Sequence, residues 1–313
     1  MGDVHVVFGL GPVGRAAIEA LSELRLPVRA VGRRYVAGLP DAIEQLAGDA
    51  ANMAFAAEAA GGAAAVYQCM NPPYNRWGDL FPPLQRSVAA AARGAGARYV
   101  SFENVYTYGD TGGAPITEDL PHAAHTRKGK VRAAMAVELK RMSAAGDLAV
   151  ATARASDYFG PGATEQSPLG ARVIGRALDG KSAQVIGDPD QPHSYAYVGD
   201  AGRVLATLGT DERTVGEVWH VPNAPTRTTR EIVAMIGAEL GRDIKVAAAP
   251  KALLRLIGLF NSDVSELIEM LYEFERPFVV DGSKFERTFG ITATPWEDSI
   301  AATVAWWRTN RAG

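Results

Sequence analysis

Short apolar runs alternate with Ala-rich stretches of helical periodicity through the first half of the chain. The runs rich in β-branched residues predict strands at Val4–Phe8, Pro27–Val31, Ala63–Gln68, Arg98–Phe102 and Ala149–Ala155, with a weaker segment near Ile43–Ala50. The stretches between them predict helices at Arg15–Leu24, Asp41–Leu46, Asn52–Ala60, Leu80–Arg93 and Arg127–Ala144. This alternation is typical of a parallel sheet with helices on both faces, so we predict a doubly wound α/β fold.

The pattern changes after Gly160, where turn-forming stretches rich in Gly, Pro, Asn and Asp separate shorter elements. We therefore divide the chain into a sheet-forming core, residues 1–160, and mainly a smaller substrate-binding lobe, residues 161–313, with some segments of the lobe returning to the core. The helices predicted in the lobe are Arg230–Leu240 with Thr229 as its N-cap, Leu253–Phe260, Val264–Phe274 and Asp298–Thr309. The second and third of these are apolar and are expected to cover a substrate cleft.

Composition narrows the class of protein without identifying it. The 313 residues are 47% hydrophobic and 21% charged, and the net charge is −3, with the basic residues scattered rather than massed. This balance disfavours a nucleic-acid partner and favours a small-molecule one. Cys69 is the single cysteine, which excludes a disulfide within the chain, and no Cys/His cluster suggests a metal site. Without a signal-peptide pattern or an apolar run of roughly 20 residues, we expect a cytoplasmic protein with no membrane partner.

Six residues between the first strand and the first helix form a phosphate-binding pattern. Gly9-Leu10-Gly11-Pro12-Val13-Gly14 has the form Gly-x-Gly-x-x-Gly between an apolar strand and an Ala-rich helix. Gly9 permits the tight turn, Gly11 lets the backbone approach a pyrophosphate, and Gly14 lets helix and strand pack closely. The helix N-terminus then supplies N–H groups and a positive dipole to the anion. The core is therefore predicted to be a Rossmann-type dinucleotide-binding domain, with Pro12 and Val13 among its cofactor-binding residues.

The end of the second strand favours NADP(H) over NAD(H). An NAD site usually has Asp or Glu there to bind the ribose 2′-hydroxyl, whereas this chain has Val31-Gly32-Arg33-Arg34. Two guanidinium groups suit a 2′-phosphate, because each can form paired charge-assisted hydrogen bonds with it. The alternative is that Arg33 and Arg34 belong to a solvated loop.

Three further cofactor-site candidates follow predicted strands at their carboxyl ends, where ligands bind in open α/β sheets. Asp49 either binds the adenine amino group or caps its strand. Cys69 and Asn71, in Cys69-Met70-Asn71-Pro72-Pro73, are predicted to line the path to the nicotinamide. No histidine neighbours Cys69 in sequence, so we expect a packing thiol rather than a nucleophile.

Four segments resemble those of the extended short-chain dehydrogenase/reductase superfamily, which includes NAD-dependent epimerases and dehydratases. They are Val100–Gly109, Arg154–Pro161, His193–Asp200 and Trp219–Asn223. The second is similar to the family's Arg-x-Phe-Asn-x-Tyr-Gly-Pro segment beside the nicotinamide, which implies that Ser156 and Tyr158 contact the cofactor. The resemblance also implies a homodimer through the helix Arg127–Ala144. The candidate substrate-binding residues are Tyr74, Tyr158 and His193.

The catalytic pair of that family is not intact in this chain. In the family, a Tyr and a Lys four residues apart on one helix exchange a proton with the substrate and hold the nicotinamide ribose. The corresponding helix start contains no Tyr; one register pairs Thr126 with Lys130, and another pairs Lys128 with Arg132. A threonine hydroxyl is too weak an acid to replace a phenol. We place Lys130 before Lys128 as the cofactor-binding lysine.

The family's upstream serine is also replaced. Asn104 takes its place if Tyr108 matches the tyrosine of the family's Val-Tyr-Gly motif, and Phe102 takes it if Tyr106 does. One of these tyrosines is expected to pack structurally and the other to be free for the pocket. The candidate catalytic residues are Lys130, Lys128, Thr126, Asn104, Tyr106 and Tyr108.

Three functions are compatible with an intact dinucleotide site beside an altered catalytic one. The first, which we expect, is an NADP(H)-dependent reductase of an activated C=O, C=C or C=N in a small, rather apolar substrate, with a non-standard proton donor. The second is an NADP(H)-binding redox sensor without catalysis. The third is a sugar-nucleotide epimerase or dehydratase, which the missing Tyr disfavours.

Overall fold

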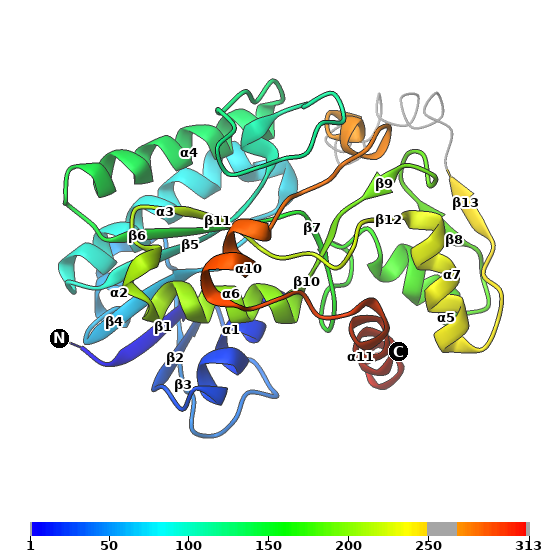
Figure 1. Cartoon of the computed structure of the whole chain (residues 1–313). Coiled ribbons are helices and arrows are strands. Elements are labelled where there is room, and N and C mark those ends of the chain that lie inside the picture. The colour runs from blue at the N-terminus through cyan, green and yellow to red at the C-terminus, as the bar shows by residue number, and fades with distance from the viewer. Residues whose placement is uncertain (1, 249–267, 311–313) are drawn as a thin grey trace.

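The computed structural model describes residues 2–248 and 268–310, and its central parallel sheet has seven strands in the order β11-β6-β5-β4-β1-β2-β3 (Figure 1). The strand bounds are β1 Val4–Phe8, β2 Val28–Gly32, β3 Glu44–Ala47, β4 Ala63–Gln68, β5 Arg98–Asn104, β6 Val150–Ala155 and β11 Val218–His220. The strand order reverses at β1, with β2 and β3 on one side and β4, β5 and β6 on the other. The predicted doubly wound α/β fold is confirmed, and ligands bind at such a reversal.

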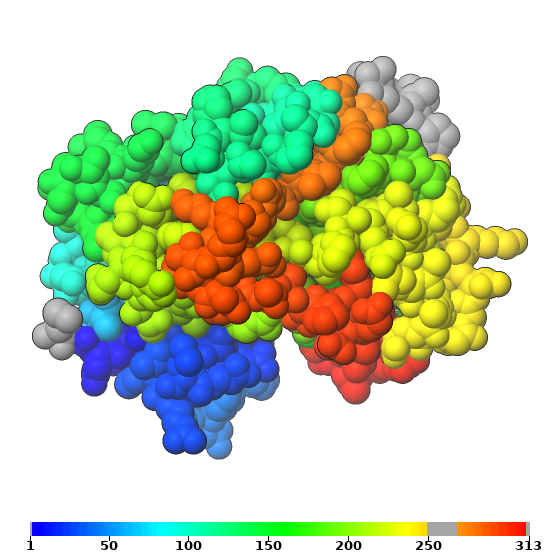
Figure 2. All heavy atoms as spheres, in the orientation of Figure 1, coloured from blue at the N-terminus to red at the C-terminus, as the bar shows by residue number. Residues whose placement is uncertain are grey.

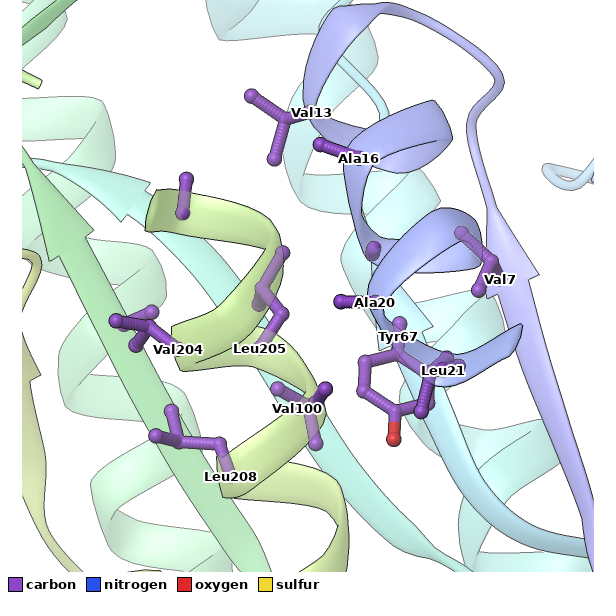
Figure 3. Packing of buried hydrophobic residues seen from close by; sticks show 14 of the residues in the cluster. Val7, Val13, Ala16, Ala20, Leu21, Tyr67, Val100, Val204, Leu205 and Leu208 are labelled. Atoms are coloured by element: carbon purple, nitrogen blue, oxygen red, sulfur yellow. The ribbon is translucent and has the colours of Figure 1, made fainter. Parts of the chain in front are cut away.

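Helices cover both faces of the sheet (Figure 1). They are α1 Pro12–Glu23, α2 Met53–Ala59, α3 Trp77–Gly94, α4 Arg127–Ala144 and α6 Val198–Thr210. α1 and α6 share one apolar core with the sheet, whereas α2, α3 and α4 contribute to the other. Figure 3 shows the first core, where Leu205 of α6 lies opposite Ala20 of α1. Gly202 permits this close approach, because a Cβ there would collide with the Ala16 carbonyl oxygen.

Two segments from beyond residue 160 complete the core. Helix α6 packs against α1, and strand β11 pairs in parallel with β6. Since each lies at a face or an end of the same sheet, the nucleotide-binding core is built from both halves of the chain.

The helix predicted at Asp41–Leu46 is wrong. Glu44–Ala47 is instead the edge strand β3, paired in parallel with β2, as the weaker strand segment near Ile43–Ala50 predicted. The Glu44 carboxylate pairs with Arg29 of β2 at 2.7 Å. Ladder pairing satisfies backbone groups that a helix of fewer than two turns would leave open, so the tertiary contact overrides local propensity.

The predicted N-cap of the helix near residue 230 is wrong by one residue. Thr228 caps α7, Thr229–Leu240, and forms a reciprocal capping box with Glu231. The Thr229 hydroxyl lies instead 2.8 Å from the hydroxyl of Tyr195 and is buried. The choice between neighbouring threonines therefore depended on a tertiary contact.

The C-terminal lobe consists of short elements around a separate apolar core that includes Phe159, Ile232, Trp296 and Trp307. Its helices are η3 Gly170–Gly175, α5 Arg176–Leu178, α7 and α11 Trp296–Thr309. Its paired strands are β7 Asp157–Phe159 with β10 Tyr195–Tyr197, β9 Pro192–His193 with β12 Arg227–Thr228, and β8 Ala183–Val185 with β13 Val246–Ala248. Trp306 packs partly buried against this core.

Five further short helices lie in the described parts of the chain. They are η1 Tyr74–Arg76, η2 Tyr106–Tyr108, η4 Glu212–Thr214, η5 Leu271–Phe274 and α10 Ser283–Phe289. The predicted helix Leu253–Phe260 lies outside the described residues. Of the predicted helix Val264–Phe274, the described part begins at Ile268 and includes η5. Among residues 2–248 and 268–310, no helix is long and apolar enough to cross a membrane, and no group of three or more His, Cys, Asp or Glu residues could hold a metal ion.

Candidate active site

The glycine loop between β1 and α1 has the backbone geometry of a phosphate cradle. Gly9 has φ +103°, a conformation that favours glycine, and a Cβ on it would lie 2.7 Å from the Met70 nitrogen. A Cβ on Gly14 would collide with the Gly9 carbonyl oxygen. Gly11, the N-cap of α1, instead faces open space: nothing lies within 4 Å of a Cβ built there, and no side chain caps the helix. This uncapped N-terminus, with Pro12 in its first turn, suits a pyrophosphate.

Arg33 and Arg34 follow β2 beside this loop, and both are exposed. A Cβ on Gly32 would lie 2.9 Å from the Leu10 side chain and 3.3 Å from the Arg34 carbonyl oxygen, so the two segments are adjacent. Neither guanidinium is paired with a carboxylate in the part of the chain that the structure describes. Two cations are therefore available next to the cradle.

The other candidates for the cofactor site differ in their surroundings, and two of them, Asp49 and Ser156, have local hydrogen-bond partners. The Asp49 carboxylate accepts a hydrogen bond from the Ala51 backbone N–H at 2.9 Å, which is the capping role left open above. Loss of solvent around the thiol group raises the pKa of Cys69 to about 12, so the reactive thiolate is disfavoured. Asn71 is exposed. The Ser156 hydroxyl donates to the Asn223 side-chain oxygen at 2.9 Å, and burial raises the pKa of Tyr158 to about 12.

Helix α4 presents one of the two possible registers to the protein interior. Lys128 and Arg132, four residues apart, are each 3% exposed, whereas Lys130 is on the exposed surface. Thr126 is the N-cap, and its hydroxyl accepts a hydrogen bond from the Gly129 N–H at 3.0 Å. Thr126 is buried as well, so burial distinguishes the two candidate lysines: Lys128 lies in the interior and Lys130 on the surface.

Lys128 lies among aromatic and acidic groups. Its Nζ is 4.0 Å from the centre of the Tyr74 ring and 3.6 Å from Oε1 of Glu269. Burial lowers the pKa of Lys128, and the Glu269 carboxylate opposes part of that shift. Glu269 also accepts hydrogen bonds from the backbone N–H groups of Arg127 and Lys128, at the start of α4.

Tyr74 and Tyr106 both pack against Trp77: the Tyr74 ring lies edge-on with ring centres 5.1 Å apart, and the Tyr106 ring is stacked with ring centres 6.0 Å apart. Burial raises the pKa of both tyrosines, so both are neutral phenols at ordinary pH. Asn104, at the end of β5, accepts a weak hydrogen bond from the Tyr106 backbone N–H at 3.4 Å. The structure thus brings together the predicted residues Lys128, Tyr74, Tyr106 and Asn104.

Tyr108 belongs to a different, structural network. Its hydroxyl accepts a hydrogen bond from Arg154 at 2.8 Å and donates one to Nε2 of His220 at 2.8 Å. Arg154 is paired with the buried Glu103 at 3.0 Å, and Nδ1 of His220 donates to the Asp281 carbonyl oxygen at 3.0 Å. These contacts connect β5, β6 and β11, so Tyr108 is the tyrosine that packs structurally.

His193 is held entirely by protein groups. Its Nε2 is 3.0 Å from Oδ2 of Asp157, its Nδ1 is 3.2 Å from the Glu273 carbonyl oxygen, and 2% of the residue is exposed. The ring also stacks on Phe274 and Phe278. Because both ring nitrogens have partners, His193 connects β9 of the lobe to β7, to η5 and to Phe278 after it.

Sequence reasoning missed three carboxyl groups in this region, on Asp157, Glu269 and Glu273. Asp157 had a signal, because it stands where the quoted family segment has Asn. The two glutamates had none, since the contact of Glu269 with α4 spans 141 positions. Lys128, Tyr74 and Tyr106 together with these carboxyl groups form a partly buried polar region near the carboxyl ends of β4, β5 and β6. Groups of this kind can exchange protons with a substrate.

Comparison with known proteins agrees with this architecture. The profile of the NAD dependent epimerase/dehydratase family matches residues 6–221. A curated relative, the dTDP-glucose 4,6-dehydratase of an Actinoplanes species, is 26% identical over 219 residues, 68% of this chain and 60% of the relative. The dTDP-glucose 4,6-dehydratase of Neisseria gonorrhoeae is 24% identical over 216 residues, 68% of this chain and 59% of the relative. The chain thus spans about six tenths of the length of these curated relatives.

Solved structures share the fold across nearly the whole chain. The dTDP-glucose 4,6-dehydratase from Bacillus anthracis in complex with NAD superimposes with a TM-score of 0.78 at 16% identity, covering 98% of this chain and 97% of that one. An epimerase from Methanothermobacter thermautotrophicus gives a TM-score of 0.81 at 15% identity, covering 99% and 93%. On the extent of the family match, this chain belongs to the NAD-dependent epimerase/dehydratase family.

Proposed function

We propose that this chain is a nicotinamide-dependent enzyme that acts at a carbon bearing a hydroxyl or carbonyl oxygen, with Lys128 as the group that exchanges the proton. The observation that carries the proposal is the burial of Lys128 on the inward face of α4, 4.0 Å from the Tyr74 ring. A nicotinamide bound at the glycine loop would supply hydride transfer at its C4 carbon.

Lys128 suits proton exchange better than the nearby phenols. Its pKa is lowered by burial toward the operating pH, whereas burial moves the pKa values of Tyr74 and Tyr106 away from it. During oxidation of an alcohol, the neutral amine of Lys128 accepts the hydroxyl proton while the C–H bond breaks; during reduction, its ammonium returns the proton. Tyr74 and Tyr106 then position the substrate oxygen beside Nζ.

Sugar nucleotides are the first substrate class to test, because the matched relatives are dTDP-glucose 4,6-dehydratases. On sequence alone, the missing catalytic tyrosine disfavours a sugar-nucleotide epimerase or dehydratase. A buried lysine in the inward register removes part of that objection, since it supplies an acid and base without the tyrosine.

A second candidate is the NADP(H)-dependent reductase, and Arg33 and Arg34 favour it. Two exposed guanidiniums beside the glycine loop, without a carboxylate partner among residues 2–248 and 268–310, suit a 2′-phosphate. We propose NADP(H) as the preferred cofactor on this ground, although the solved neighbour from Bacillus anthracis contains NAD. We also propose that the protein is a cytoplasmic homodimer whose two subunits pack through α4.

Two activity assays and a cofactor-binding measurement separate the candidates. The chain is incubated with NAD⁺ or NADP⁺ and dTDP-glucose or UDP-glucose, and the products are examined by mass spectrometry for loss of water and by NMR for an inverted centre. In parallel, NADPH is incubated with enones, ketones and imines while the absorbance of the reduced nicotinamide is followed. Sugar conversion supports the first function, and NADPH oxidation supports the second. Tight cofactor binding without either reaction supports the redox sensor and contradicts both.

A further inference from the structure

Glu273 is buried, yet one of its carboxyl oxygens has no partner. The residue is 2% exposed. Its Oε1 accepts a hydrogen bond from the Tyr272 hydroxyl at 3.4 Å, whereas Oε2 has no hydrogen-bond partner within the described structure. Buried polar atoms in native proteins nearly always have one, so an orphaned oxygen marks the place of a ligand group or a water molecule.

The groups that face Glu273 do not neutralise it as a carboxylate. Asp157 of β7 is near enough to repel it, and Tyr74 and Tyr106 approach from η1 and η2. His193 of β9 contacts the backbone carbonyl of Glu273 and pairs its other nitrogen with Asp157. Burial and Asp157 together raise the pKa of Glu273, which favours the neutral form of its carboxyl group.

Glu273 also lines a cavity that opens to solvent. The cavity is small, with room for about one water molecule or one hydroxyl group. It lies between the loop after η2 and the chain from η5 onward; besides Glu273 its lining includes Gly109, Asp110, Thr111, Tyr272, Arg276 and Phe278. Backbone bridges from Val280 to Ile116 and from Phe278 to His193 hold the second of these segments in place. Figure 2 shows that this segment, in orange, runs across the surface between the core and the lobe. Glu273 therefore lines the cavity, and its charge contributes to the raised pKa values of Tyr74 and Tyr106.

We propose that the neutral carboxyl group of Glu273 binds the substrate by donating a hydrogen bond to an uncharged hydroxyl or carbonyl oxygen. The inference rests on the proposed function and adds a feature of the substrate: the part that reaches this cavity is a single uncharged hydroxyl or carbonyl group. A phosphate or carboxylate is excluded there for two reasons. Asp157 repels an anion, and the cation at the cavity, Arg276, is already paired with Asp110 at 3.1 Å.

Infrared difference spectroscopy of the NADP⁺-loaded chain tests this binding. The wild type and the control Glu297→Gln, an exposed residue on α11, are expected to show the C=O band of a protonated carboxyl group at neutral pH, and Glu273→Gln is expected to lack it. The probes are dTDP-glucose, UDP-glucose and free glucose, with inorganic phosphate as the anionic probe. At least one neutral-sugar probe is expected to shift the band, and phosphate is expected to leave it unmoved.

Binding of the sugar probe that shifts the band is then compared between variants. Glu273→Leu is expected to weaken it about tenfold, and Glu273→Gln, which keeps a neutral donor, is expected to weaken it less. Absence of the carboxyl band overturns the proposal, and so does a band that no sugar probe shifts, since a water molecule then holds the orphaned oxygen. A band shift without turnover would contradict the proposed function alone, because the assays above measure chemistry separately.

Discussion

The Nζ atom of Lys128 lies 4.0 Å from the centre of the Tyr74 ring, so an ammonium group and a phenol share one buried site. If Lys128 exchanges the substrate proton, Lys128→Met should lower kcat by about 100-fold or more, the usual contribution of a general acid or base. The cofactor dissociation constant should change little.

A matched control stands two residues away on the same helix. Lys130 is exposed, so Lys130→Met should leave kcat unchanged. Steady-state kinetics on whichever substrate the assays identify make this comparison. Equal losses in the two variants would contradict a specific role for Lys128.

Arg33 and Arg34 set the choice of cofactor in our proposal. Arg33→Ala and Arg34→Ala should each weaken NADP⁺ binding about tenfold, which is about 1.4 kcal/mol, because a charge-assisted bond to the 2′-phosphate is lost. NAD⁺ lacks that phosphate, so its affinity should not change and serves as the internal control. Calorimetric titration with both cofactors measures the effect, and a wild type that binds both equally would refute the preference.

Two glycines of the loop should respond differently to an added side chain. Gly11 faces open space, so Gly11→Val should fold with an unchanged melting temperature but lose cofactor binding by blocking the pyrophosphate. Gly14→Ala places a Cβ against the Gly9 carbonyl oxygen and should cost about 1–3 kcal/mol of unfolding free energy. Thermal unfolding with and without cofactor separates the two effects. Cofactor binding retained by Gly11→Val would place the phosphate elsewhere.

The Tyr108 hydroxyl joins Arg154 to His220, and removing it leaves two buried groups without this partner. Tyr108→Phe should therefore lower the unfolding free energy by about 1–3 kcal/mol. The exposed Tyr35 provides the control, since Tyr35→Phe removes a hydroxyl that solvent already satisfies. Urea denaturation of the three proteins would reveal a loss confined to Tyr108→Phe.

Burial lowers the pKa of His220 to about 4, against 6.5 in the unfolded chain. Between these values the unfolded state binds a proton that the folded state does not, so stability falls as the pH falls from about 6.5 to about 4. For one group the loss reaches about 3 kcal/mol. Urea denaturation across this range should therefore give a steeper decline for the wild type than for His220→Gln, and parallel curves would contradict the assignment.

Much of the fold was predictable because its signals are local. The alternation of apolar runs and helical stretches predicted β1, β2, β4, β5 and β6 with the main helices around them. The prediction of a helix at Asp41–Leu46 was wrong because β3 is stabilised by its pairing with β2. The prediction of Thr229 as the N-cap was wrong because its hydroxyl contacts Tyr195. In both cases a partner distant in sequence outweighed the local preference.

The candidate site was predictable only in part. Spacing placed Lys128 and Arg132 on one helical face and Thr126 and Lys130 in the other register, but spacing does not say which side faces inward. Burial against Tyr74, Trp77 and Phe81 decided this. Glu269 and Glu273 carried no motif that identified them as members of the polar region.

The sequence by itself determined the dinucleotide cradle, because Gly9, Gly11 and Gly14 lie within six consecutive residues and their backbone requirements are local. It also determined the absence of the family tyrosine and the presence of two arginines after β2. Only the tertiary structure decided what surrounds Lys128, since Tyr74 and Glu269 come from separate parts of the chain. A pKa depends on burial and on neighbouring charges, and both of these arise only when the chain is folded.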